Sequence, residues 1–124
     1  MVSRLTVILL LATLAIGCTP GPAAPDYSTG EFRVTGSASV THANIYFQAF
    51  DGAGMNVLYN VDLADPWTQS FGAVQAGADY FLAAQSNDNA AGALTIEVFV
   101  DAVLIDADTT SVSFGYVAVY GAVP

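Results

Sequence analysis

The chain is poor in cysteine and in cationic side chains, and each shortage excludes a class of protein. It has one cysteine, so it can form neither an intramolecular disulfide nor a thiolate metal cluster. Its 124 residues include no lysine and two arginines against 11 acidic side chains, which gives a formal net charge of −9. Such a chain cannot neutralise a phosphate backbone, which argues against nucleic acids as partners.

Helical signals are also scarce. After Cys18 no stretch of about ten residues combines a 3.6-residue apolar period with caps. The chain is short enough to form a single domain. Its 54% content of hydrophobic residues excludes a disordered protein.

Apolar residues recur instead with a period of two, which predicts β-strands. The clearest strand runs from Leu94 to Asp101, and a second from Asn44 to Phe50 alternates in the same way. A third run, in which Val57 and Tyr59 are expected on the same face as Val61, ends at Leu63.

The last run, from Ser111 to Val123, carries apolar residues on both of its faces. One face holds Val112, Phe114, Tyr116, Ala118 and Tyr120, and the other holds Val117 and Val119. Strands that are apolar on both faces are typical of the covered centre of a sheet, so we expect this strand to be central.

Turn signals separate these runs at residues 51–54, 75–79 and 87–92, at spacings that suit hairpins. Seven or eight short antiparallel strands in one domain predict an all-β fold, a single immunoglobulin-like β-sandwich. Because the chain has no cysteine pair, its stability must come from the core alone.

The N-terminal segment is typical of a secretory signal. Arg4 precedes an apolar run from Leu5 to Ile16, which is too short to span a bilayer, since that takes roughly 20 apolar residues. The run ends in the sequence LAIGC, whose cysteine is Cys18. This ending resembles a bacterial lipobox, in which the signal peptide is cleaved before a lipid-modified cysteine.

We therefore expect a cleaved lipoprotein signal peptide at residues 1–17 and a lipid-modified Cys18 that anchors the chain to a membrane. A proline-rich tether would occupy residues 18–30, and the β-sandwich residues 31–124. The alternative is that the signal peptide is cleaved at another position and that Cys18 is a structural cysteine at the start of the mature domain. Lipidation predicts a bacterial cell-envelope protein that faces the periplasm or the exterior.

Residues that could carry chemistry are few. His42 is the only histidine, and no nucleophile motif accompanies it, so a solvated or packed side chain is the simpler interpretation. Acidic residues around Asp101 and at 106–108, together with the oxygen-rich loop 86–89, could in principle bind calcium, but they match no calcium-binding pattern. No pair of carboxylates stands out as a glycosidase pair. We predict a non-catalytic protein without a metal or cofactor.

Aromatic side chains offer candidates for binding. Trp67 follows Pro66 at the start of an expected strand that ends at Val74. Its indole could form an exposed platform for a sugar or a protein, or it could fill the space between the sheets, as one large aromatic often does in sandwiches. Tyr59 and Tyr116 are the other candidate binding residues.

Four short segments resemble the MmpS-type domain, a small membrane-attached β-sandwich that accompanies RND-family exporters. They are VTG at 34–36, PWT at 66–68, GADYFLAAQSN at 77–87 and LTIEVFVD at 94–101. The resemblance extends over about residues 31–123. It implies a β-sandwich, no catalytic residues and an exporter as partner.

Several features differ from that family, among them the membrane attachment and one turn. Its familiar members are held by a transmembrane helix, whereas this chain has the lipobox. Asp101 and Ala102 stand where Asp-Gly would favour a tight hairpin, and because alanine disfavours positive φ, we expect a different turn there.

Two functions follow from these observations. The first is an envelope accessory or protein-interaction module on a lipid anchor, with an RND-type exporter as its possible partner. The alternative is a carbohydrate- or lipid-binding module on the cell surface that uses Trp67, Tyr59 and Tyr116. A small hydrolase is a third hypothesis, and it would require a cleft with a perturbed carboxylate.

Overall fold

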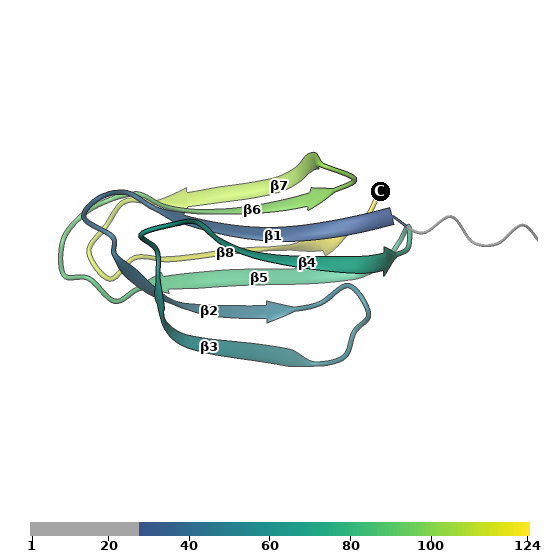
Figure 1. Ribbon diagram of the computed structural model, residues 1–124, viewed down its shortest axis with the longest axis horizontal. Coiled ribbons are helices and arrows are strands. Elements are labelled where there is room, and N and C mark those ends of the chain that lie inside the picture. The colour runs from purple at the N-terminus through teal and green to yellow at the C-terminus, as the bar shows by residue number, and fades with distance from the viewer. Residues whose placement is uncertain (1–27) are drawn as a thin grey trace, which may run out of the picture.

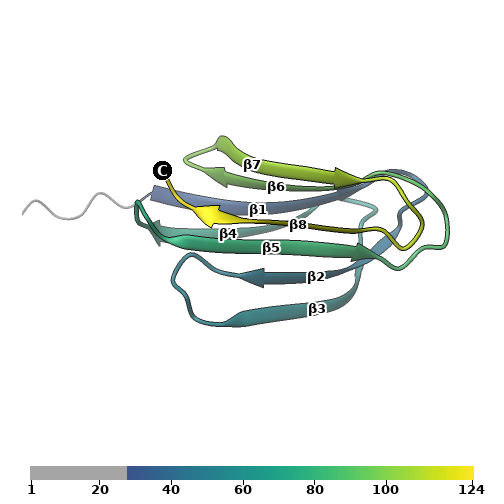
Figure 2. The ribbon, with the colours of Figure 1, turned by 180° about the vertical axis from the view of Figure 1, so that it is seen from behind.

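The computed structural model describes residues 28–124, which form eight β-strands and no helix. The strands are β1 (Ser28–Gly36), β2 (His42–Gln48), β3 (Met55–Asp62), β4 (Trp67–Val74), β5 (Asp79–Ser86), β6 (Leu94–Val100), β7 (Val103–Thr110) and β8 (Tyr116–Ala122). They build two four-stranded antiparallel sheets, ordered β4-β1-β6-β7 and β3-β2-β5-β8 (Figures 1 and 2). The predicted all-β sandwich is confirmed.

The connections differ from those expected. Only β2–β3 and β6–β7 are hairpins within one sheet, and the other connections cross between the sheets. The turns at 75–79 and 87–92 therefore do not close hairpins. In antibody constant domains the first strand pairs with the second, whereas here β1 lies between β4 and β6. The structure thus shows a two-sheet β-sandwich, and the immunoglobulin-like assignment is not confirmed.

The described residues begin inside the expected tether. β1 starts at Ser28, before the expected domain boundary at residue 31. The signal segment, Cys18 and the tether as far as residue 27 lie outside the described residues. Among residues 28–124 no helix is long and apolar enough to cross a membrane.

Alternating side chains of β1, β2 and β6 point between the sheets and make the centre of the core. Ile45 and Ile96 are fully buried, and the polar residues that alternate with them face outward. This burial pattern confirms the alternation read from the sequence for Leu94 to Val100 and for Asn44 to Ala49. Phe50, expected on the face opposite Phe47, lies beyond the end of β2 and is buried in the core, so the alternation fails there.

Aromatic rings fill the core where β4 covers the sandwich. Phe32 packs against Phe50 and Phe71 at centroid distances of 5.1 and 5.0 Å, and Phe47 lies 5.9 Å from Phe32. Gly30 faces this cluster, and a Cβ atom there would lie 2.5 Å from the Phe50 ring. Because Gly30 has no side chain, the Phe50 ring can pack against its backbone.

The orientation expected for β3 is wrong in its first half. Val57 and Tyr59 face solvent, while Leu58 packs against the core. A β-bulge at Asn60, which has a φ of 54°, shifts the register against β2 and returns Val61 to the core side. One inserted residue thus reverses which face a period-two pattern buries.

β8 is an edge strand, so the expectation of a central strand is wrong. It pairs only with β5, and it spans Tyr116–Ala122 rather than the whole run from residue 111 to 123. Val117 and Val119 face the core, whereas Tyr116 and Tyr120 are 55% and 79% exposed. The apolar residues on its second face are therefore surface residues.

The β6–β7 turn has the tight geometry that alanine was expected to prevent. Val100 pairs with Val103, so two residues make the turn, and both have positive φ: 50° for Asp101 and 63° for Ala102. This is the backbone of a type I′ hairpin. The Asp101 carboxylate accepts a hydrogen bond of 2.9 Å from the Thr29 backbone N–H, which ties the turn to β1.

Ala102→Gly should stabilise the domain by about 1 kcal/mol, because a Cβ in the left-handed region costs roughly 1–2 kcal/mol, which glycine avoids. For a domain of this size the melting temperature should rise by roughly 4–8 °C. Ala107, which is in β7 with ordinary strand geometry, is the matched control. Ala107→Gly should lower stability by roughly 0.5–1 kcal/mol. A fall in melting temperature for both variants would contradict the turn geometry.

Candidate binding face

The outer side of the sheet β3-β2-β5-β8 is covered by uncharged side chains, five of them aromatic, and we call it the aromatic face. Strand pairing aligns Met55, Gln48, Phe81 and Tyr120 in one row. The next row is Val57, Tyr46, Ala83 and Ala118, and the third contains Asn44, Gln85 and Tyr116, with Tyr59 at the β3 bulge. These three rows contain no charged side chain.

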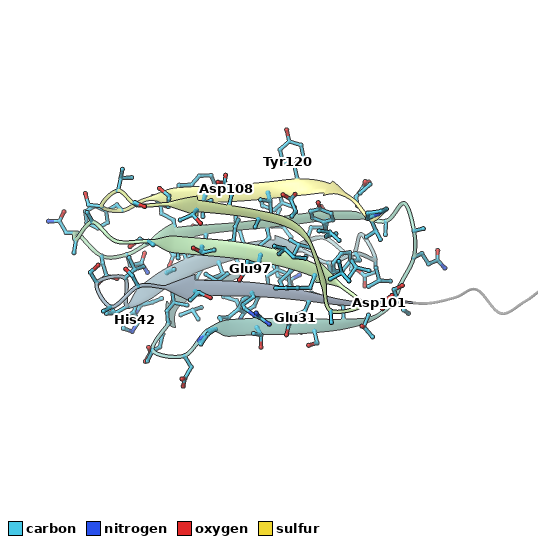
Figure 3. All side chains as sticks on the ribbon, turned by 90° about the horizontal axis from the view of Figure 1, so that it is seen from above. Glu31, His42, Glu97, Asp101, Asp108 and Tyr120 are labelled. Carbon is cyan, nitrogen blue, oxygen red and sulfur yellow. The ribbon has the colours of Figure 1, made fainter. Side chains whose placement is uncertain are left out.

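The aromatic face is solvent-exposed at its margins and hollowed at its centre. Tyr59 and Tyr120, on the two edge strands, are 74% and 79% exposed, and Tyr120 stands clear of the sandwich (Figure 3). Tyr46, Met55, Phe81, Gln85 and Tyr116 border a shallow hollow of about 260 Å³. An exposed apolar patch of this kind on a monomer is often an interaction site.

The outer side of the other sheet carries charged and polar side chains, with Phe99 and the exposed Leu104 paired beside them. Arg33 forms an ion pair of 3.0 Å with Glu31 and lies 4.5 Å from the Phe99 ring centroid. Thr95 and Thr109 share a hydrogen bond of 3.0 Å across β6 and β7. A hollow of about 470 Å³ near the start of β1 includes Glu31 in its lining, and that carboxylate already has Arg33 as its partner.

The structure brings together two of the three candidate binding residues. Tyr59 and Tyr116 lie on the aromatic face, at opposite edges of its sheet. Trp67 lies apart from them, at the start of β4, where its half-buried ring packs 5.6 Å from Phe47. This position matches the interpretation of Trp67 as filling the space between the sheets.

Sequence reasoning missed most of the aromatic face. Tyr46, Phe81, Tyr120 and Met55 belong to it and were not among the candidates. Each lies on a different strand, so only the register between strands shows that they adjoin. Their shared alternation with buried neighbours was the one available signal.

His42 and the oxygen-rich loop 86–89 meet at one end of the sandwich, where they make a structural network. The Asp88 carboxylate accepts hydrogen bonds from the backbone N–H groups of Thr41 and His42, at 2.8 and 3.1 Å, and from the Thr41 hydroxyl. The backbone N–H of His42, then that of Thr41, holds the pKa of Asp88 below its usual value. The carboxylate is thus engaged in fastening the loop to β2.

The other acidic residues considered for calcium have separate surroundings. Asp101 accepts hydrogen bonds from Thr29, and its backbone bond holds the pKa of that carboxyl below its usual value. Asp106 accepts a hydrogen bond of 2.8 Å from the Tyr80 hydroxyl, and burial together with this bond raises the pKa of Tyr80 to about 12. Within residues 28–124 no three His, Cys, Asp or Glu side chains gather as a metal site would require.

Comparison with known proteins adds no assignment. The chain matches no protein-family model, and no curated protein is detectably similar to it in sequence.

Asp88→Asn should lower the melting temperature at pH 7, because the amide would replace a carboxylate that accepts several hydrogen bonds. The folded-state pKa of Asp88 is depressed, so its contribution is present above the unfolded pKa of about 3.9 and is lost as pH falls through the lower folded value. The difference in melting temperature between Asp88→Asn and the wild-type protein should therefore become smaller below about pH 4. Thermal unfolding from pH 7 to pH 2.5 measures it.

Asp65 is the matched control, since its exposed carboxylate accepts no hydrogen bond from the described residues. Asp65→Asn should unfold like the wild-type protein at each pH. If the melting temperature of Asp88→Asn stayed below that of the wild-type protein by the same amount from pH 7 to pH 2.5, the charge of the Asp88 carboxylate would not be what fastens the loop.

Proposed function

We propose that this protein is a non-catalytic lipoprotein of the bacterial cell envelope whose β-sandwich binds another protein through the aromatic face. The observation that carries the proposal is the contrast between the two sheets. One outer side carries charged side chains, including the ion pair of Arg33 with Glu31. The other presents tyrosines, a phenylalanine and a methionine without any charge across three rows.

The composition of the aromatic face favours a protein as its partner. The centres of protein–protein interfaces are enriched in tyrosine, phenylalanine and methionine and depleted of acidic side chains and lysine. Tyrosines such as Tyr116 and Tyr120 also lose little side-chain entropy on binding, because two torsion angles define them. Exposed rings on both edge strands would flank a partner seated over the hollow at Phe81.

The membrane anchor rests on the sequence. The lipobox-like ending at Cys18 supports a lipid anchor. The resemblance of residues 31–123 to the MmpS-type domain supports an accessory role, with an RND-type exporter as the partner to examine first. A lipid-anchored accessory domain needs no catalytic residues, in keeping with the structural use of Asp88 and the partnered state of Asp106.

A carbohydrate-binding module is the second candidate. Tyr46, Tyr59 and Tyr116 could stack against sugar rings, and the amides of Asn44 and Gln85 could donate and accept hydrogen bonds beside them. The same rings would then select glycans in an array, and their replacement would abolish that selection.

Photo-crosslinking in intact cells tests the protein-binding function. With p-benzoylphenylalanine in place of Tyr120, irradiation should yield an adduct with an envelope protein. In place of Thr109, an exposed residue on the polar side, the same group should yield none. Tyr116→Ser should reduce the Tyr120 adduct several-fold, because it removes a neighbouring ring from the face. Equal adducts from both positions, or none from Tyr120, would refute binding through the aromatic face.

Cys18→Ser tests the anchor. The serine cannot accept a thioether-linked lipid, so the variant should accumulate as an unprocessed precursor or appear in the soluble fraction. Metabolic labelling with a radioactive or clickable fatty acid, followed by fractionation, measures both outcomes. A variant that stays processed and membrane-bound without label would exclude lipidation at Cys18.

A further inference from the structure

Both ends of the aromatic face are acidic, and this charge pattern specifies its partner. We propose that the partner is a protein surface with an apolar centre and cationic side chains on two opposite sides of it. The inference rests on the proposed protein-binding function and adds the chemistry of the partner.

The acidic ends are defined by four aspartates. At one end of the face, Asp62 of β3 lies opposite His42 of β2 in the strand register. Asp65 follows in the connection to β4. At the other end Asp79 starts β5, facing the same side as Phe81, and Asp51 lies in the β2–β3 turn. Along the strand direction Asp62 and Asp79 are about eight residues apart in register, roughly 27 Å at about 3.4 Å per residue.

Within residues 28–124 these aspartates have no arginine or lysine beside them, and the histidine His42 lies opposite Asp62 in the strand register. The only arginine or lysine there is Arg33, and it lies on the polar side of the other sheet, paired with Glu31. Their carboxylates are exposed, so an approaching partner meets uncompensated negative charge at both ends. Complementary charge of this kind steers encounter and rejects partners of the wrong sign.

The aromatic face is smaller than a typical stable interface, so a partner that extends along the strands reaches those ends. Four strands about 4.8 Å apart and five residues along each give an uncharged area of roughly 300 Å². A stable protein interface covers about 800 Å² on each partner. A partner that covers more of this sheet along the strands must therefore lie over the acidic ends as well.

The charge pattern also excludes other occupants. Because both ends are acidic, two copies stacked face to face would set aspartates against aspartates in either relative direction. An anionic lipid surface would meet the same repulsion. A cationic protein surface meets none of it.

The test places p-benzoylphenylalanine at Tyr116 in the full-length chain in intact cells and measures the yield of adduct. Asp65→Lys and Asp79→Lys each reverse one charge, one at each end, and neither carboxylate accepts a hydrogen bond from the described residues. Each should lower the yield about threefold, and the two together about tenfold. The matched control, Glu97→Lys, makes the same charge change on the polar side and should leave the yield within about twofold. Circular dichroism of each purified variant verifies that the sandwich is intact.

Mass spectrometry of the adduct separates the outcomes. A crosslinked segment bordered by lysines or arginines on both sides, with the expected loss of yield, supports the proposal. If a protein adduct forms and its yield is unchanged by Asp65→Lys and by Asp79→Lys, the charge inference is overturned and the protein-binding function still holds. An adduct with a second copy of this chain or with lipid overturns the inference, and the absence of any adduct overturns both.

Discussion

The packing of aromatic rings between the two sheets is the constraint on which the rest of this structure depends. Residues 28–124 contain no cysteine, so no disulfide joins the sheets there, and the separation of the sheets is set by side-chain volume. Phe32 contacts Phe50 and Phe71, and Gly30 leaves the space that the Phe50 ring occupies. Because the core buries the inward side of β1, β2, β5 and β6, the sheets meet solvent or a partner chiefly through their outer sides.

One outer side is exposed to solvent, and the other is available to bind a partner. The sheet that holds β1 and β6 carries the ion pair of Arg33 with Glu31, together with Glu97, and is an ordinary solvated surface. The other sheet keeps its aspartates, such as Asp62 and Asp79, at the strand ends and its rings in the middle. Carboxylates at the ends keep so apolar a face soluble without interrupting it, which is why solubility and binding can share one sheet.

The sequence predicted what local alternation determines and missed what pairing between strands determines. β6 was predicted correctly because no bulge interrupts its inward residues before Val100. Tyr59 was grouped with Val61 on one face because the bulge at Asn60 leaves no mark on a period-two pattern. The position of β8 at the sheet edge and the grouping of Tyr116 with Tyr46 and Phe81 depend on register across strands, which local sequence does not encode.

Under the proposed lipid anchor at Cys18, the position of β1 would favour a partner beside the domain over one in the bilayer. β1 begins at the same end of the sandwich as the C-terminus (Figures 1 and 2), so the segment that precedes Ser28 joins the domain at a strand end. The aromatic face runs along the strands. If a lipid on Cys18 held the domain from that end, the aromatic face would be directed parallel to the membrane, toward neighbouring envelope proteins. Asp51, Asp79 and Asp101 would lie at the end nearest the membrane, where their charge opposes contact with anionic headgroups.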